Sequence, residues 1–208
     1  MAIENISYVT ESGELLGVAS REDVHKRGLW HETFHCWVVT RELGRQMIHF
    51  QLRSSEKADF PDLFDITAAG HIAADESVED GVREIEEELG LSLDLAELTP
   101  LGIIHDEISL PGFTDRERAH VYLYQGAPIT LADYRLQRAE VTGVALADFR
   151  SFFELCTKQV EQIDVRGFRE TAAGREEIRQ TIGLSDMVPH EARYWREVAI
   201  RIRKELMA

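Results

Sequence analysis

The sequence predicts a mixed α and β fold organised as one main domain. The chain has 208 residues and 44% hydrophobic content, enough to bury one substantial core. Short runs rich in β-branched and aromatic residues recur along most of the chain, separated by turn residues. One amphipathic helix interrupts these runs. Strands and helices therefore alternate irregularly, which favours an antiparallel or mixed sheet over a regular repeat of parallel strands.

The N-terminal part is expected to consist mainly of strands. The first two flank Glu11-Ser12-Gly13-Glu14, a sequence typical of a hairpin turn. A polar segment that contains Pro61 is expected to be a loop. In chain order, the expected elements are strands at 6–10 and 14–20, a short helix or loop at 21–32, strands at 34–40 and 46–53, a loop at 54–64 and a strand at 64–69.

A helix is expected after this strand. Asp75 or Ser77 is suited to cap its N-terminus, because short polar side chains bond the free backbone N–H groups there. The spacing i, i+3, i+7 places three apolar side chains on one face, which is typical of a helix packed against a core. These residues are Val82, Ile85 and Leu89.

The C-terminal part is expected to add three strands and more helices. The tail at 174–206 is interpreted as one or two helices, broken near Gly183 and Pro189. The chain is accordingly divided into a domain of residues 1–170 and a helical extension of residues 171–208, packed on that domain. The elements before the tail are strands at 99–108, 119–125 and 141–148 and a helix at 151–162.

The composition excludes several classes of function. A net charge of −15 argues against binding to nucleic acid or an acidic membrane, but it is compatible with a phosphorylated small molecule bound through divalent cations. Cys36 and Cys156 match neither a metal site nor a disulfide framework. No signal peptide and no apolar run of membrane-spanning length is present. We therefore expect a cytoplasmic protein with reduced thiols.

Three like charges gather on the predicted helix. Glu84, Glu87 and Glu88 fall within an arc of roughly 100°, beside the apolar stripe. Like charges four positions apart destabilise a helix by a few tenths of a kcal/mol, and Arg83 alone cannot neutralise three glutamates. The spacing fits two interpretations, a solvated acidic surface or a site for Mg²⁺ or Mn²⁺.

The surrounding residues favour the second interpretation. Gly70, Glu76 and the run Arg83-Glu84-Ile85-Glu86-Glu87-Glu88-Leu89-Gly90-Leu91 resemble the Nudix box, G-x5-E-x7-R-E-U-x-E-E-x-G-U, where U is aliphatic. The second half matches at every defined position. Only six residues, 77–82, separate Glu76 from Arg83, where the pattern has seven. This departure leaves the role of Glu76 open.

The resemblance extends over residues 5–150, to the Nudix hydrolases related in sequence to type 1 isopentenyl-diphosphate isomerase. It implies an α/β/α sandwich around a mixed sheet, with the box as loop–helix–loop. A second departure is the segment Pro61-Asp62-Leu63-Phe64-Asp65, where such proteins have Pro-Gly-x-Trp-Asp.

The resemblance also implies an activity and a site. The activity is Mg²⁺-dependent hydrolysis of a diphosphate linkage in a small substrate of the nucleoside-diphosphate type, with Mn²⁺ as an alternative cation. Candidate catalytic residues are Arg83, Glu84, Glu87 and Glu88. Candidate metal ligands are the carbonyl of Gly70, the same three glutamates and Glu140. Candidate substrate-binding residues are Arg53, Lys57, His71 and Glu117. Apart from the resemblance, Trp30, Phe34, Trp37 and Phe64 could stack on a base, although such residues are more often part of the core.

Several of these assignments have alternatives. The general base is left open among Glu87, Glu88, Glu117 and Glu140. Arg53 and Lys57 could belong to a solvated basic loop. An isomerase-like enzyme would need a catalytic cysteine where the chain has Ala69. A third interpretation is a catalytically silent Nudix fold that senses a ligand. The tail could cap the site or form a homodimer.

Four residues lie close to positions at which the isomerase has metal ligands: His25, His31, His71 and Glu117. They could equally be ordinary hydrogen-bonding residues at strand ends.

Overall fold

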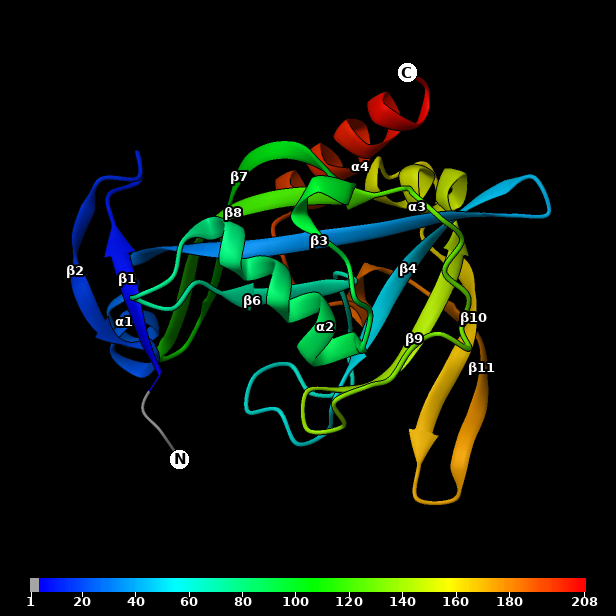
Figure 1. Cartoon of the computed structure of the whole chain (residues 1–208), viewed down its shortest axis with the longest axis horizontal. Coiled ribbons are helices and arrows are strands. Elements are labelled where there is room, and N and C mark those ends of the chain that lie inside the picture. Colours follow the sequence, from blue (N-terminus) through cyan, green and yellow to red (C-terminus); the bar gives the residue numbers. More distant parts are fainter. Residues whose placement is uncertain (1–3) are drawn as a thin grey trace.

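A computed structural model describes residues 4–208, and its strands form one mixed sheet with helices on both faces (Figure 1). The predicted mixed α and β class is confirmed. The strands are β1 Asn5–Val9, β2 Leu15–Ser20, β3 Trp30–Glu42, β4 Arg45–Arg53, β5 Phe64–Asp65, β6 Ala68–His71, β7 Leu98–Leu110, β8 Phe113–Tyr124, β9 Val141–Asp148, β10 Ile163–Thr171 and β11 Gly174–Ile182. The helices are α1 Arg21–Arg27, α2 Arg83–Leu89, α3 Phe149–Cys156 and α4 Ala192–Leu206, with 3₁₀ turns at Val78–Val82, Leu95–Glu97 and Leu184–Asp186.

Strand β3 is the centre of the sheet. It pairs antiparallel with β1, β4 and β6 and parallel with β8. Its side chains alternate between the two faces, as the pleat of a strand requires. Phe34, Cys36 and Val38 enter one apolar cluster, and Trp37 and Val39 enter the other. Both faces of β3 are therefore buried.

The helices cover these two faces. Helix α2 packs on β6 and supplies Ile85 and Leu89 to the first cluster. Helices α3 and α4 pack on each other and on β4 and β7, and their Phe152 and Trp195 enter the second cluster. The layers are those of the sandwich that the resemblance implies. None of the helices in residues 4–208 is long and apolar enough to cross a membrane.

The tail differs from its prediction. Residues 163–182 form the hairpin β10–β11, and only α4 is a long helix in this region. The helical prediction for 174–182 is wrong, and the boundary at 170/171 falls inside the hairpin. Strand β11 is mostly exposed and its side chains are mostly polar or charged, so it lacks the apolar period of a strand. Its pairing with β10, which pairs with β9, fixes its conformation.

Smaller differences concern element lengths. The strand expected at 64–69 is split into β5 and β6, and the helix expected at 151–162 ends at Cys156.

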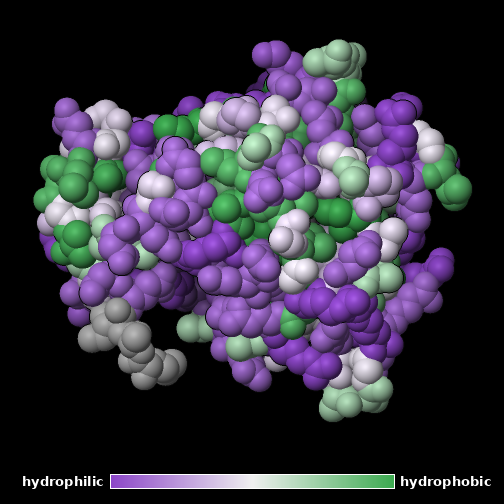
Figure 2. All heavy atoms as spheres, in the orientation of Figure 1, coloured by the Kyte–Doolittle hydropathy of each residue, from purple (hydrophilic) through white to green (hydrophobic). Residues whose placement is uncertain are grey.

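The opposite edge of the sheet is apolar. Strand β2 ends the strand order and exposes Leu15, Leu16 and Val18. Figure 2 shows apolar side chains gathered at this end of the molecule, on a surface that is otherwise mainly hydrophilic.

Candidate active site

The acidic helix is held close to the centre of the sheet. The predicted apolar stripe is confirmed, because Ile85 and Leu89 are fully buried. Just before α2, a Cβ atom on Gly81 would lie 2.6 Å from Cβ of Phe34 on β3. Glycine therefore allows the 3₁₀ turn to approach β3 closely, and this contact fixes the height at which the glutamates of α2 stand above the sheet.

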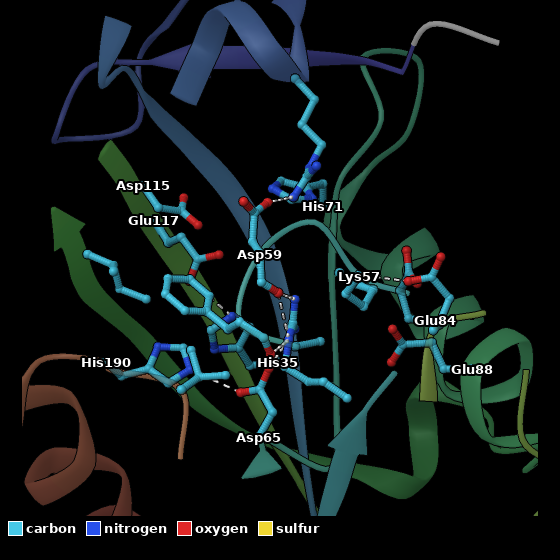
Figure 3. A pocket seen from close by; sticks show the side chains of 18 of the residues that line it. His35, Lys57, Asp59, Asp65, His71, Glu84, Glu88, Asp115, Glu117 and His190 are labelled. Atoms are coloured by element: carbon cyan, nitrogen blue, oxygen red, sulfur yellow. Dashed lines mark hydrogen bonds and ion pairs between the residues drawn. The ribbon is translucent and has the colours of Figure 1, made fainter. Parts of the chain in front are cut away.

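The carboxylate face of α2 forms one wall of a cavity of about 360 Å³ (Figure 3). Strands β4, β5, β6 and β8, the loop between β4 and β5, the loop before β9 and the segment before α4 supply most of the remaining walls. All ten candidate site residues line this cavity, so the structure brings the whole set together. They are Arg53, Lys57, Gly70, His71, Arg83, Glu84, Glu87, Glu88, Glu117 and Glu140. Their individual roles stay predictions.

The candidate stacking residues do not line the cavity. Phe34, Trp37 and Phe64 are buried in the two core clusters. The aromatic rings of the cavity wall belong instead to Phe60 and Phe113, whose centroids lie 6.1 Å apart.

Arg83 organises the carboxylates of the box. Its Nε and Nη2 donate to the two oxygens of Glu76, at 2.6 and 2.8 Å. Its Nη1 donates to Glu84 at 2.6 Å and to Glu87 at 3.2 Å. One guanidinium thus holds three carboxylates at fixed positions, in the bidentate geometry that arginine favours.

The shortened box still allows Glu76 to reach Arg83. The residues between them form the 3₁₀ turn Val78–Val82 in place of a first α-helical turn. A 3₁₀ helix rises about 2.0 Å per residue, against 1.5 Å in an α-helix, so fewer residues span a given distance. Glu76 also accepts a hydrogen bond from the backbone N–H of Ala73 at 2.9 Å.

Two glutamates of α2 have too little positive charge nearby to balance their own negative charge. Burial raises the pKa of Glu88 to about 8, and the neighbouring Glu84 adds to the rise. Burial likewise raises the pKa of Glu84, although Arg83 opposes it. The contact that Glu88 makes with Gln51 is long, at 3.5 Å. The positive charge near these neighbouring carboxylates is therefore too small to balance their negative charge.

The donor set fits a hard divalent cation. Glu84 packs directly on Gly70, where an added Cβ would lie 2.3 Å from the carboxyl carbon. A backbone carbonyl and carboxylates that face one cavity are the oxygen donors that Mg²⁺ and Mn²⁺ prefer.

The candidate phosphate-binding cations are already engaged. Arg53 donates to the carbonyls of Asp59 and Phe60 and to Asp65. Lys57 forms an ion pair with Glu140. Among the residues that line the cavity, carboxylates outnumber Lys and Arg side chains nine to four.

A second group of possible metal ligands lies at another wall of the cavity. The Nε2 atoms of His25 and His31 lie 3.5 and 3.3 Å from one oxygen of Asp115, and Nε2 of His71 lies 3.3 Å from Nε2 of His25. Burial lowers the pKa of His25 to about 4 and that of His71 well below its usual value, so both are neutral at pH 7. Neutral imidazoles beside a carboxylate are suitable metal ligands.

Several cavity residues were missed by sequence reasoning. Asp115 stands two positions before Glu117 on β8, so the alternation of a strand could have placed both on one face. Asp65 ends the segment that resembles Pro-Gly-x-Trp-Asp, but no local pattern gave a signal for His190 or for its contact with Asp65. They lie 3.1 Å apart in space and 125 residues apart in sequence.

The comparison with known families explains this architecture. The NUDIX domain model matches residues 29–163. The chain belongs to the Nudix family.

Relatives and solved structures agree with this assignment. An uncharacterized Nudix hydrolase of Clostridium acetobutylicum is 37% identical over 199 residues, 95% of this chain and 96% of the relative. An isopentenyl-diphosphate Δ-isomerase of Saccharopolyspora erythraea is 29% identical, over 72% of this chain and 75% of the isomerase. A crystal structure of a Deinococcus radiodurans protein matches with a TM-score of 0.55 at 18% identity, covering 75% and 88% of the two chains, and shows likeness of fold.

The cysteines of this Nudix hydrolase lie away from the cavity. Ala69 lines the cavity beside Gly70, whereas Cys36 and Cys156 are buried in the core clusters. Burial raises the pKa of Cys36 to about 12, so this thiol is inert at neutral pH.

Proposed function

We propose that this Nudix hydrolase is a Mg²⁺-dependent pyrophosphohydrolase that cleaves a diphosphate linkage in a substrate of the nucleoside-diphosphate type, with Mn²⁺ as an alternative cation. The observation that carries this proposal is the undercompensated pair Glu84 and Glu88 in a cavity where carboxylates outnumber Lys and Arg nine to four. A diphosphate would be repelled from such a cavity unless divalent cations entered with it.

The residues that would hold the cation are Glu84, Glu87, Glu88 and the carbonyl of Gly70. When bound, Mg²⁺ neutralises charge on the phosphates and lowers the pKa of a bound water. Arg83 positions Glu84 and Glu87 by ion pairs, and Glu76 in turn fixes the plane of the Arg83 guanidinium. The protein thus contributes oriented carboxylates, and catalysis depends on positioning and charge.

The proton of the attacking water needs an acceptor. Oε2 of Glu117 is buried and has no hydrogen-bond partner in residues 4–208, whereas Glu140 is paired with Lys57. Nε2 of His35 lies 3.3 Å from this Glu117 oxygen but donates no hydrogen bond to it, which favours Glu117 as the general base. Glu140 would then be a metal ligand, beside its ion-pair partner Lys57.

An isomerase-like activity on an isoprenoid diphosphate is the second candidate. It is favoured by the cluster of His25, His31, His71 and Asp115, together with the isomerase relatives. Against it stands Ala69, which has no acid or base to offer at the position where the isomerase-like pattern has cysteine. A Nudix fold that binds its ligand without turnover is the third candidate. A cytoplasmic location and a homodimer also stay predictions.

The test is cleavage of the diphosphate linkage by the full chain with Mg²⁺, with the phosphorylated products separated by chromatography, across a panel of ADP-ribose, dinucleoside polyphosphates, nucleoside triphosphates and isopentenyl diphosphate. Glu87→Gln and Glu88→Gln are measured in parallel. Glu86→Gln is the matched control, because Glu86 is on the same helix, is exposed and lies outside the cavity wall.

Turnover of one class that is lost in both variants and kept in the control supports the hydrolase. Isomerisation of isopentenyl diphosphate without cleavage of its diphosphate linkage would support the second candidate. Nucleotide binding without turnover would support the third. Turnover that does not respond to Mg²⁺, or that survives in Glu88→Gln, would refute the proposed site.

A further inference from the structure

The cavity is completed by a segment that lies beyond the matched Nudix domain. Val188 and His190 line the cavity, although the family model ends at residue 163. This segment is anchored to β5, because the backbone N–H of Val188 donates to the carbonyl of Phe64 at 2.9 Å. In Figure 3, His190 stands on the side of the cavity opposite Glu84 and Glu88. The C-terminal segment therefore contributes to the site itself.

His190 bridges two buried carboxylates. Its Nδ1 donates to Asp106 at 2.6 Å and its Nε2 donates to Asp65 at 3.1 Å. The side chains of His190, Asp65 and Asp106 are 6%, 4% and 1% exposed. Burial alone would lower the pKa of His190, but the two carboxylates raise it to about 10, so the ring is a cation at neutral pH. Asp106 also accepts the backbone N–H of Glu191 at 2.9 Å, just before α4.

The bridge continues into the loop between β4 and β5. The second oxygen of Asp65 accepts Nη1 of Arg53 at 2.9 Å. The remaining donors of Arg53 reach the carbonyl of Asp59 at 2.8 Å and the carbonyl of Phe60 at 3.1 Å. An unbroken chain of charge-assisted contacts thus runs from His190 to the backbone of this loop.

The loop depends on this support. Phe60 and Asp62 have φ angles of 53° and 60°, a left-handed conformation that side-chain-bearing residues rarely adopt without surroundings that hold them. Residues 54–63 include Lys57, Asp59 and Phe60, which line the cavity. On its other side the loop is tied by Asp59 to Arg21, at 3.3 Å.

We propose that His190 is a positioning residue of the hydrolase, which fixes the substrate-facing loop 54–63 through Asp65 and Arg53. The expected change in KM rests on the proposed function, whereas the expected change in the loop does not. The chain of contacts ends on the loop and does not include α2. Loss of His190 should therefore weaken substrate binding and leave the cation site on α2 intact.

The test compares His190→Asn with Arg201→Gln in the full chain. Arg201 also ties the C-terminal helix to the sheet, through the carbonyls of Leu101 at 2.7 Å and Ile103 at 3.2 Å, and it does not line the cavity. The readouts are hydrogen exchange of a peptide that covers residues 54–63, Mn²⁺ affinity without substrate, and KM and kcat on the substrate that the panel identifies.

For His190→Asn we expect at least tenfold faster exchange of the loop and a KM raised roughly 10- to 100-fold, as for removal of other residues that orient a ligand-binding group. The Mn²⁺ affinity and kcat should change less than about threefold. For Arg201→Gln the loop and KM should be unchanged. Equal changes in both variants, or an unchanged loop in His190→Asn, would overturn the proposal. Absence of turnover refutes the proposed function alone, because exchange and Mn²⁺ binding are measured without turnover.

Arg53→Lys provides a test that keeps the buried His190 pairs intact. Lysine can reach Asp65 or a carbonyl, but it cannot reproduce the planar set of donors. We expect the same loss of loop protection. Its combination with His190→Asn should add little, because both changes break one chain of contacts. Additive effects in the double variant would show that the two residues act separately.

Discussion

Two groups of buried carboxylates face each other across the cavity, and they differ in what balances their charge (Figure 3). Asp65 receives hydrogen bonds from His190 and Arg53. These offset the effect of burial and lower its pKa to about 2. On the opposite wall, burial and mutual repulsion raise the pKa of Glu88 to about 8. The first group is balanced by the protein and the second is not, and under the proposed function a cation from solution would balance it.

This difference distinguishes acidic residues that stabilise the fold from acidic residues that are suited to a functional role. A carboxylate whose cation is a side chain of the same chain holds the fold in place. A carboxylate that the fold buries without a sufficient cation reduces stability, and perturbed groups of this kind gather at functional sites.

The largest effect is expected for Glu88→Gln. The variant should lose roughly a thousandfold in kcat, because several kcal/mol of transition-state stabilisation depend on the cation. Without divalent metal at pH 9, the same variant should be more stable than the parent by on the order of 3 kcal/mol, because a buried uncompensated charge is removed. Chromatographic measurement of the cleavage products and urea unfolding measure the two effects. A variant that is both inactive and less stable would contradict the comparison.

Asp65→Asn should change stability in the opposite direction. It leaves the His190 cation with one carboxylate and Arg53 with none. We expect a loss of about 3–5 kcal/mol in the free energy of unfolding at pH 7, as for other broken buried ion pairs. Urea unfolding checks this value. An unchanged stability would show that Asp65 is not balanced in the way its contacts indicate.

The pH dependence should also separate the two groups. The pKa of Glu88 is raised in the folded state, so its contribution to stability is present at low pH and is lost as pH rises from about 4.5 to about 8. The pKa of Asp65 is lowered, so its contribution is present above about 3.8 and is lost as pH falls toward 2.

Bound metal should remove the loss of stability that the ionised Glu88 carboxylate causes at high pH. Saturating Mg²⁺ at about 100 times its Kd should raise Tm by about 5–10 °C at pH 8.5. The increase should be smaller at pH 6, where a proton competes for Glu88. Thermal unfolding with Mg²⁺ and with EDTA measures the difference. An equal rise at both pH values would argue against Glu88 as a ligand.

The smallest effect is expected for Glu76→Gln. This change weakens the hydrogen bonds that orient Arg83, while every proposed metal ligand remains. We expect kcat to fall roughly tenfold. The free energy of unfolding should change by less than about 1 kcal/mol, because the Arg83 and Glu76 side chains are 32% and 21% exposed. Glu79→Gln, at an exposed position of the same turn, is the control. Equal activity of both variants would show that the shortened box has left Glu76 without a role.

The sequence identified residues that share one cavity where the signal was local, and their roles stay predictions. The spacing of Glu84, Glu87 and Glu88 placed them beside a buried stripe, and the structure puts them on the wall of a cavity. The histidines near the isomerase positions also converge, around Asp115. Helix periodicity and a short consensus pattern depend on neighbouring residues, so one sequence is enough to reveal them.

The prediction failed where pairing over distance decided the result. Strand β11 carries mostly polar and charged side chains and is a strand because β10 lies beside it. Phe34 and Trp37 are core residues, as such aromatic residues more often are, because the alternation of β3 directs them into the two clusters.

The sequence by itself was enough to identify the family, the class of fold and the carboxylates that a cation would need. All three depend on patterns among residues that are close together along the chain. Only the tertiary structure decided which buried acids are already balanced and that the C-terminal segment enters the site. Asp65, Asp106 and His190 come from three separate segments, and their charges interact only after folding has removed water from between them.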